Sequence, residues 1–388
     1  MFTELLDLVI SDANAVHQIL VTNDRLRKIL DKDNQIRSRL EEIDELKLLI
    51  NDSPHETSWR VCDHCSAVTR LYAIYEQFVK NLIIGWLDLL PNYIVKYEQL
   101  EERIRNTHRV GVGKLLIDLS KDRFNHLPIE KVVGSLFDGI SGKNNYNLIP
   151  EAFLLQEQNL RKAELNRLIC NIGIENAWDW IENHRNVKEY IADEKKAEYE
   201  LNQLVLFRNR AAHGAIDVDE ILGVGSLTEL VDFTKALCIA LEELFAYSAL
   251  EKRTGSGEFI KIGDITEWFA EPDAGVAKIS DVVLSQEDEV ILASKSLSYC
   301  CSAKIISIQE DNEPRLNIQI KEETELGLKF DVSAREGLEI YIFTQNRSAS
   351  AATPAVDIEL EPEDIPEPGI IGDEAFLEDV IEPPGVDD

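Results

Sequence analysis

Residues 201–214 read Leu201-Asn202-Gln203-Leu204-Val205-Leu206-Phe207-Arg208-Asn209-Arg210-Ala211-Ala212-His213-Gly214. The apolar side chains Leu201, Leu204, Val205 and Phe207 recur at helical spacing, which is typical of a helix with one buried face. Gly214 follows as the residue type that most often ends a helix. The stretch therefore predicts a helix that ends beside His213 and belongs to an all-α core.

The polar end of this stretch combines residue types that can cleave RNA. RNA supplies its own nucleophile, the 2′-hydroxyl, so an enzyme must remove that proton, stabilise the phosphorane and protonate the leaving oxygen. We assign acid or base chemistry to His213, phosphate binding to Arg208, and orientation of the phosphate or the imidazole to Asn209. The expected product carries a 2′,3′-cyclic phosphate, and the reaction needs no metal and no cofactor.

Helical geometry places these three side chains unevenly. At ~100° per residue, Asn209 and His213 share a face, whereas Arg208 lies about 140° around the helix from His213. One helix therefore does not close the site. We expect a second copy of the helix, or a neighbouring helix, to bring the arginine and the imidazole to one phosphate, and hence a homodimer.

Arg208, Asn209 and His213 resemble the signature of the HEPN superfamily of ribonucleases, in which an arginine and a small polar residue precede a histidine. The upstream run Tyr72-Ala-Ile-Tyr-Glu76-Gln-Phe-Val-Lys80 is similar to the first core helix of HEPN proteins found near antiphage and toxin genes. The resemblance covers residues 58–250. It implies a helical bundle and gives Glu76 a supporting role, either pairing with Arg208 or lying on the surface with Lys80 as its i,i+4 partner.

The formal charge of −32 argues against general affinity for nucleic acid, so RNA binding requires a local basic surface. Basic residues outnumber acidic ones between residues 103 and 131. The expected surface comprises Arg103, Arg105, His108, Arg109, Lys114, Lys121, Arg123 and Lys131, and Arg210 is a further candidate contact. A solvated helix face explains the same residues equally well.

Other patterns limit location and chemistry. The acidic N-terminus and the lack of a long apolar run predict a cytoplasmic protein with no membrane association. Cys62-Asp63-His64-Cys65 could form half of a zinc site, but no second pair stands at suitable spacing, so structural thiols are favoured. Gly111-Val-Gly-Lys114 lacks both the first glycine and the magnesium-binding Ser or Thr of a phosphate loop.

The sequence predicts an α+β protein of several domains. An all-α region spans residues 1–250, with helices over 1–53 and a long helix over 58–90 that Pro91 is expected to end. Further helices are expected near residues 93–106, 113–120 and 129–137. After Arg253-Thr-Gly-Ser-Gly257 the pattern changes to short strands, which we place in a small β-barrel over residues 258–345. The expected strands are 260–269, 274–279, 289–293, 301–309, 316–320, 326–330 and 338–343. Residues 346–388 are acidic and rich in proline, and are expected to form a disordered tail.

The barrel region resembles the second domain of elongation factors. Gly263-Asp-Ile-Thr-Glu-Trp-Phe-Ala270, Gly275-Val-Ala-Lys-Ile279, Glu325-Leu-Gly-Leu-Lys-Phe330 and Arg335-Glu-Gly-Leu-Glu-Ile-Tyr341 follow one another in the corresponding order. No GTPase accompanies them. The resemblance implies tRNA or another translation-related RNA as the substrate, an analogy at the level of the fold.

We therefore expect a metal-independent endoribonuclease that acts as a toxin or antiphage effector, with RNA and an antitoxin or regulatory protein as partners. The alternative is a non-catalytic HEPN dimer that docks a partner through its barrel. A third hypothesis makes the acidic tail an inhibitor that occupies the basic surface.

Overall fold

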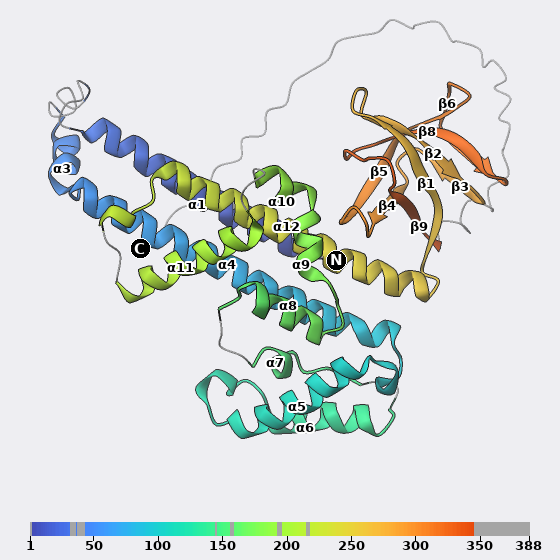
Figure 1. Cartoon of the computed structure of the whole chain (residues 1–388), viewed down its shortest axis with the longest axis horizontal. Coiled ribbons are helices and arrows are strands. Elements are labelled where there is room, and N and C mark those ends of the chain that lie inside the picture. The colour runs from blue at the N-terminus through green and yellow to red at the C-terminus, as the bar shows by residue number, and fades with distance from the viewer. Residues whose placement is uncertain are drawn as a thin grey trace, which may run out of the picture.

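The helical part of the chain is built around two long helices, α4 (Glu56–Tyr93) and α12 (Val224–Gly255). The computed structural model describes residues 2–31, 36, 43–143, 146–155, 159–191, 196–214 and 218–344. The helix α1 (Thr3–Leu30) packs on both long helices, and α11 (Ala197–His213) packs on α4 (Figure 1). Their apolar faces meet in one core cluster, so the predicted all-α bundle is confirmed.

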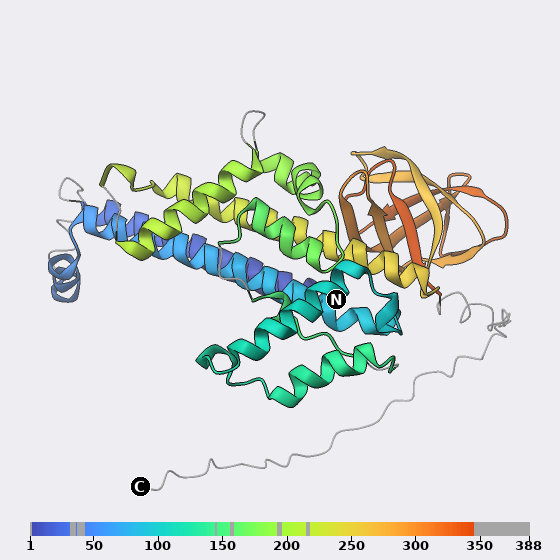
Figure 2. The ribbon, with the colours of Figure 1, turned by 60° about the horizontal axis from the view of Figure 1, so that its bottom comes forward.

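Shorter helices surround this bundle. α5 (Glu102–Asp118) and α6 (Ile129–Ile140) pack on each other and form a separate layer below α4 (Figures 1 and 2). The remaining short helices connect or cover the long ones: α3 (Asp44–Asp52), α7 (Pro150–Phe153), α8 (Lys162–Asn171), α9 (Ala177–Asn183), α10 (Arg185–Tyr190) and the 3-10 turns η1 (Tyr97–Gln99), η2 (Asp122–Phe124) and η3 (Val218–Glu220).

Two helix boundaries differ from the prediction. Pro91 lies inside α4, which continues to Tyr93, because the carbonyl of Leu90 still accepts the N–H of Ile94 at 2.9 Å. Separate helices were expected near residues 93–106 and 113–120, but α5 is one helix. Gly111 in that helix allows close contact with α7, since a Cβ there would lie 2.0 Å from the carbonyl oxygen of Ala152. The glycine permits packing and does not end the helix.

By length and composition alone, α1 is the one described helix that could cross a membrane. The sequence pattern did not single it out. Four of its residues are buried, Val9, Ala13, Val16 and Leu20, and its neighbours are α4 and α12.

The second region is a closed antiparallel barrel, as predicted. Six strands follow the order β4-β9-β1-β2-β8-β5, and β4 also pairs with β5, which closes the ring. The strands are β1 (Phe259–Phe269), β2 (Ala274–Ile279), β4 (Glu289–Ser294), β5 (Tyr299–Glu310), β8 (Thr324–Phe330) and β9 (Glu339–Phe343). Short β6 (Glu313–Arg315) pairs antiparallel with the end of β5, and β3 (Val282–Ser285) pairs with β7 (Asn317–Ile320). The strands β3 and β6 were not predicted. The tail expected to be disordered, 346–388, lies outside the described residues.

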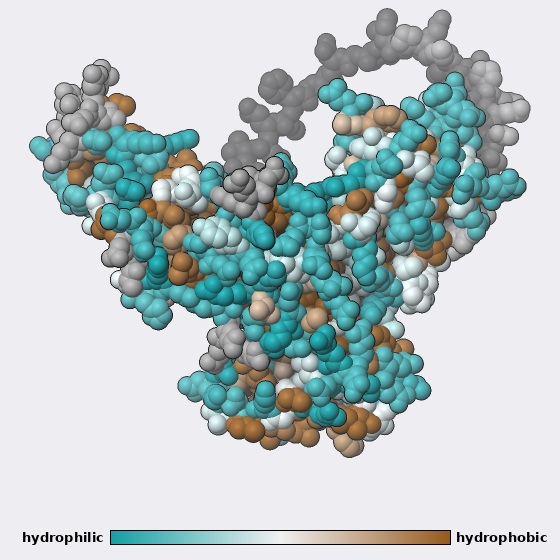
Figure 3. All heavy atoms as spheres, in the orientation of Figure 1, coloured by the Kyte–Doolittle hydropathy of each residue, from teal (hydrophilic) through white to brown (hydrophobic). Residues whose placement is uncertain are grey.

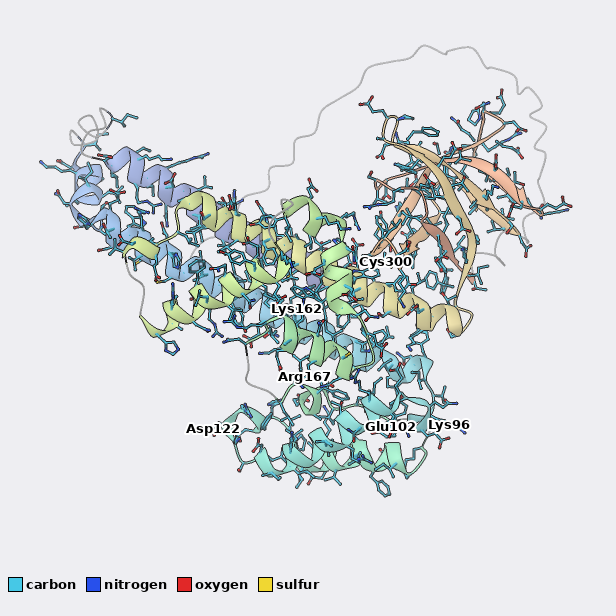
Figure 4. The ribbon with its side chains drawn as sticks, viewed as in Figure 1. Lys96, Glu102, Asp122, Lys162, Arg167 and Cys300 are labelled. Carbon is cyan, nitrogen blue, oxygen red and sulfur yellow. The ribbon has the colours of Figure 1, made fainter. Side chains whose placement is uncertain are left out.

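The barrel is joined to the helices through Glu243 of α12, which is 3 % exposed. Its carboxylate accepts hydrogen bonds from the guanidinium of Arg185 and, at 2.9 Å, from the backbone N–H of Cys300 in β5. Figure 4 labels Cys300 where the barrel meets the helices. Burial alone would raise the pKa of Glu243, but hydrogen bonds from His184 and Arg185 hold it below its usual value. A buried charged contact therefore links the two regions.

Candidate functional site

The predicted helical stretch forms the second half of α11. Leu201, Leu204 and Val205 are buried, and the helix ends at His213 as expected. Gly214 has φ 66° and serves as the left-handed C-cap, a conformation that glycine adopts at low cost. Arg208 and Asn209 therefore lie in the last two turns, next to the middle of α4.

The guanidinium of Arg208 lies over the ring of Tyr72 in α4. Its central carbon is 4.3 Å from the ring centre, the geometry of a cation–π contact. Its Nη1 donates to Oδ1 of Asn209 at 2.8 Å and to Oδ1 of Asn159 at 3.1 Å. Tyr72 is fixed in turn, because its hydroxyl accepts the backbone N–H of Leu160 at 3.0 Å. The structure thus brings Arg208 and Asn209 together and adds Asn159, which no sequence pattern indicated, and Tyr72, to which the sequence assigned no role in the site.

A second arginine lies beside the same tyrosine. Arg161 precedes α8, and its Nη1 donates to Oδ1 of Asn202 in α11 at 2.8 Å. Burial raises the pKa of Tyr72, whereas the positive charges of Arg208 and Arg161 oppose that rise. Lys162, the next residue, is paired with Glu198 at 3.0 Å and is labelled in Figure 4. The sequence signal for this side of the site was the run Asn159-Leu-Arg-Lys162. It places an amide and two basic residues at the start of α8.

Among the residues that the structure describes, the side chains that accept hydrogen bonds from these two arginines are neutral. Arg208 and Arg161 both hydrogen-bond to amide oxygens, which orient a guanidinium without cancelling its charge. Arg210, which the sequence offered as a further RNA contact, differs because it forms an ion pair with Glu220 at 2.8 Å, and we leave it out of the site. Two half-exposed cations beside one aromatic ring suit a phosphate group, which an arginine can bind through two parallel hydrogen bonds.

Glu76 does not take the pairing with Arg208 that we considered. Its ion pair is with Lys80, at 3.1 Å and one helical turn away. Its charge still acts on Tyr72, whose pKa it helps to raise after the larger effect of burial. Glu76 therefore lies near the site, but the contacts that orient Arg208 come from Asn159, Asn209 and Tyr72.

His213 lies apart from this group. It is exposed at the end of α11, and among the described residues it forms no hydrogen bond or ion pair. Arg208 instead faces α4, as its contact with Tyr72 shows. Within one copy of the chain, the described part of the site does not bring the imidazole to the arginine. Helical geometry predicted this separation, and completion of the site by another helix stays a prediction.

The predicted RNA-binding surface on α5 is less continuous than its sequence suggested. Arg103, Arg109 and Lys114 are exposed, but Arg105 is only half-exposed. His108 is fully buried, and burial lowers its pKa to about 4. It is a neutral structural residue, bonded to the hydroxyl of Tyr97 through Nδ1 at 3.1 Å, and does not belong to a basic surface. Figure 1 also shows α5 in a different layer from α11.

The Cys62–Cys65 motif has other uses in the fold. Asp63 accepts hydrogen bonds from Arg27 and Asn23, and Nδ1 of His64 accepts the N–H of Leu222 at 3.1 Å. His64 also meets the ring of Phe207 edge-on, at 5.4 Å between centres, which packs α4 against α11. Among the residues that the structure covers, no group of three or more His, Cys, Asp or Glu side chains could hold a metal ion.

Comparison with known families gives a match over the helical region. The family model described as MAE_28990-like HEPN matches residues 30–252, which is more than half of the chain and includes α4 and α11. No curated protein and no solved structure matches.

Proposed function

Because this chain belongs to the MAE_28990-like HEPN family, for which a nuclease or RNA-related role is expected, we propose that it is an endoribonuclease whose site is built on α11. The observation that carries the proposal is the setting of Arg208. Its guanidinium lies on the Tyr72 ring and is oriented by two amide oxygens, and none of these contacts within the described part of the chain cancels its charge. An RNA phosphate is the ligand that best fits such a cation.

In the proposed reaction, the 2′-oxygen of a ribose attacks the adjacent phosphorus. The O2′–P bond forms, the P–O5′ bond breaks, and a 2′,3′-cyclic phosphate and a 5′-hydroxyl result. Arg208, with Arg161 beside it, stabilises the charge that develops on the phosphate oxygens. His213 serves as the acid or base that moves a proton at O2′ or O5′. No step requires a metal ion.

A homodimer completes the site in this proposal. His213 is exposed at the end of α11, whereas Arg208 faces α4 of its own chain. A second α11, supplied by the partner copy, can bring its histidine to the phosphate that the first copy binds. The finer parts of the proposal are tRNA or another translation-related RNA as substrate, a toxin or antiphage role, an antitoxin or regulatory partner, and a cytoplasmic location.

Three variants test the role of the arginines. Arg208→Ala removes the oriented cation, Arg161→Gln removes its neighbour, and Arg210→Ala removes an arginine that is already paired with Glu220. We expect purified Arg208→Ala to cleave total RNA about 10²–10³-fold more slowly than wild type. Arg161→Gln should give a smaller loss, and Arg210→Ala should match wild type. Equal rates for all four proteins would remove Arg208 from the mechanism.

One observation favours a second function, a non-catalytic dimer that docks a partner through the barrel. His213 lacks any contact with Arg208 within the described residues, so one copy does not bring the phosphate-binding arginine and the acid–base histidine together. Wild-type protein that binds RNA but leaves it intact at all concentrations would favour this alternative.

A further inference from the structure

Tyr199, in the first turn of α11, is an exposed aromatic residue on the helix that carries the candidate site. Its side chain is 54 % exposed, and within the described part of the chain it forms no hydrogen bond and no ring contact. Of the aromatic side chains that the structure covers, only Phe137 on α6 and Phe269 on β1 are exposed in the same way. A single exposed ring is common on protein surfaces. Tyr199 differs from the other two because it lies beside the arginines of the site.

Tyr199 shares one side of α11 with the two amides that orient those arginines. At ~100° per residue, Tyr199, Asn202 and Asn209 lie within about 80° of one another around the helix. The amide oxygen of Asn202 accepts a hydrogen bond from Arg161 at 2.8 Å, and that of Asn209 accepts one from Arg208 at 2.8 Å. The aromatic ring and the two guanidinium groups are therefore arranged along one side of the helix.

The spacing along α11 suits one strand of RNA. At 1.5 Å per residue, Tyr199 lies about 4.5 Å from Asn202 and about 15 Å from Asn209, measured along the helix axis. Successive phosphates of a stacked strand advance about 3.4 Å along its axis, so a few nucleotides cover this length. A strand whose phosphates contact Arg208 and Arg161 therefore brings a base within reach of Tyr199.

The surroundings of Tyr199 are polar, and the nearest acidic side chain in sequence is paired. Glu198 forms an ion pair with Lys162 at 3.0 Å, and Lys162 is labelled in Figure 4 at the start of α8. Figure 3 shows a mainly hydrophilic surface where α8 and α11 lie. No other large apolar side chain of these two helices is exposed in the described structure. An isolated ring among polar groups suits a base of a nucleic acid better than an apolar protein surface.

We propose that Tyr199 stacks on an unpaired base of the RNA whose phosphates contact Arg161 and Arg208. An aromatic ring can stack on any base, and one such contact strengthens binding on the order of tenfold. The proposal rests on the proposed ribonuclease function for its ligand. Tyr199 acts on binding and takes no part in moving a proton.

The test measures binding without cleavage, with dodecamers of 2′-O-methyl nucleotides that lack the attacking hydroxyl. One dodecamer carries adenine at every position, and the other is the same sugar–phosphate chain without bases. Wild type should bind the adenine dodecamer about tenfold more tightly than the abasic one. Tyr199→Ser should lose most of this preference, while its affinity for the abasic chain stays within about twofold of wild type.

Two control variants accompany Tyr199→Ser. Tyr199→Phe keeps the ring and removes only the hydroxyl, so it should bind both dodecamers as wild type does. Phe137→Ser removes a ring that is 61 % exposed on α6, away from α11, and should also match wild type. Light scattering gives the oligomeric state of each variant, which should not change.

Four results would overturn the proposal. They are equal affinity of wild type for the two dodecamers, or no binding of either; a full preference for bases in Tyr199→Ser; an equal loss in Tyr199→Phe; and dissociation of a dimer by Tyr199→Ser, which would assign the ring to a second copy.

The binding assay also separates this proposal from the proposed ribonuclease activity. Wild type that cleaves RNA, with a full preference for bases in Tyr199→Ser, would refute the stacking role alone. Wild type that leaves RNA intact, but binds the adenine dodecamer through Tyr199, would refute the ribonuclease activity and support the stacking role.

Discussion

Arg208 and Tyr72 form the contact on which the candidate site is built, with the guanidinium carbon 4.3 Å from the centre of the ring. The two residues are 136 positions apart in sequence and belong to α11 and α4. The tyrosine presents its ring to the arginine and uses its hydroxyl to accept the N–H of Leu160. Tyr72 is thus a positioning residue, and its two functions can be separated by substitution.

Tyr72→Phe keeps the ring and removes the hydroxyl, whereas Tyr72→Leu removes both. The buried N–H of Leu160 then lacks its acceptor in either variant, so each should lose about 1–3 kcal/mol of stability in urea unfolding. Cleavage rates should separate them. The cleavage rate of Tyr72→Phe should stay within severalfold of the wild-type rate. The rate of Tyr72→Leu should be at least tenfold lower than that of Tyr72→Phe, because Arg208 no longer contacts an aromatic ring. Similar activities for the two folded variants would contradict a positioning role for the ring.

The proposed dimeric site can be tested by mixing two inactive variants. Arg208→Ala and His213→Ala each lack one half of a composite site. In a randomly mixed dimer population half of the dimers are heterodimers, each with one intact site of two, so a 1:1 mixture should recover about a quarter of wild-type activity. Co-refolding before the assay ensures exchange of copies. Activity no higher than that of the separate variants would place arginine and histidine in the same chain.

His108 should make the fold sensitive to acid. Burial lowers its pKa to about 4, whereas an unfolded histidine titrates near ~6.5, so protonation favours the unfolded chain. Its contribution to stability is intact above pH 6.5 and declines by about 3 kcal/mol as the pH falls towards 4.

His108→Gln removes this titration and retains groups that can replace its bonds to Tyr97 and to the N–H of Ile149. Urea unfolding at several pH values gives the free energy of unfolding of both proteins. The amount by which wild type exceeds the variant at pH 7 should shrink, or change sign, as the pH falls to 4. A constant difference in the free energy of unfolding over this range would show that protonation of His108 is not coupled to unfolding.

Glu243 should determine how firmly the barrel is joined to the helices. Glu243→Ala leaves Arg185 and the N–H of Cys300 without their acceptor, and losing one partner of a buried charged contact costs about 3–5 kcal/mol. The matched control is Asp232→Ala on the same helix, which removes a 59 % exposed carboxylate and should cost less than about 0.5 kcal/mol. Urea unfolding monitors both variants, together with proteolysis between α12 and β1. Equal free energies of unfolding for the Glu243→Ala and Asp232→Ala variants would show that Glu243 does not stabilise the junction.

Local patterns predicted much of this molecule, and long-range contacts account for what they missed. Helical spacing of Leu201, Leu204 and Val205 and the glycine after His213 determined α11, and alternating residues indicated most barrel strands. No periodicity relates Asn159, Arg161 or Tyr72 to Arg208, because these contacts join distant segments. Counting charges along the sequence wrongly placed His108 on a basic surface. Its burial and its hydrogen bonds to Tyr97 and Ile149 follow from the packing of α5 against its neighbours, which local sequence does not show.

The most direct test of the central claim is cleavage of a defined RNA by purified full-length protein in the presence of EDTA, with analysis of the product ends. Wild type should cleave at the same rate with and without the chelator and leave a 2′,3′-cyclic phosphate and a 5′-hydroxyl. His213→Ala should be slower by about 10²–10⁴-fold, while the control Arg210→Ala keeps the wild-type rate. Cleavage by His213→Ala at the wild-type rate, or products with a 5′-phosphate, would contradict the account.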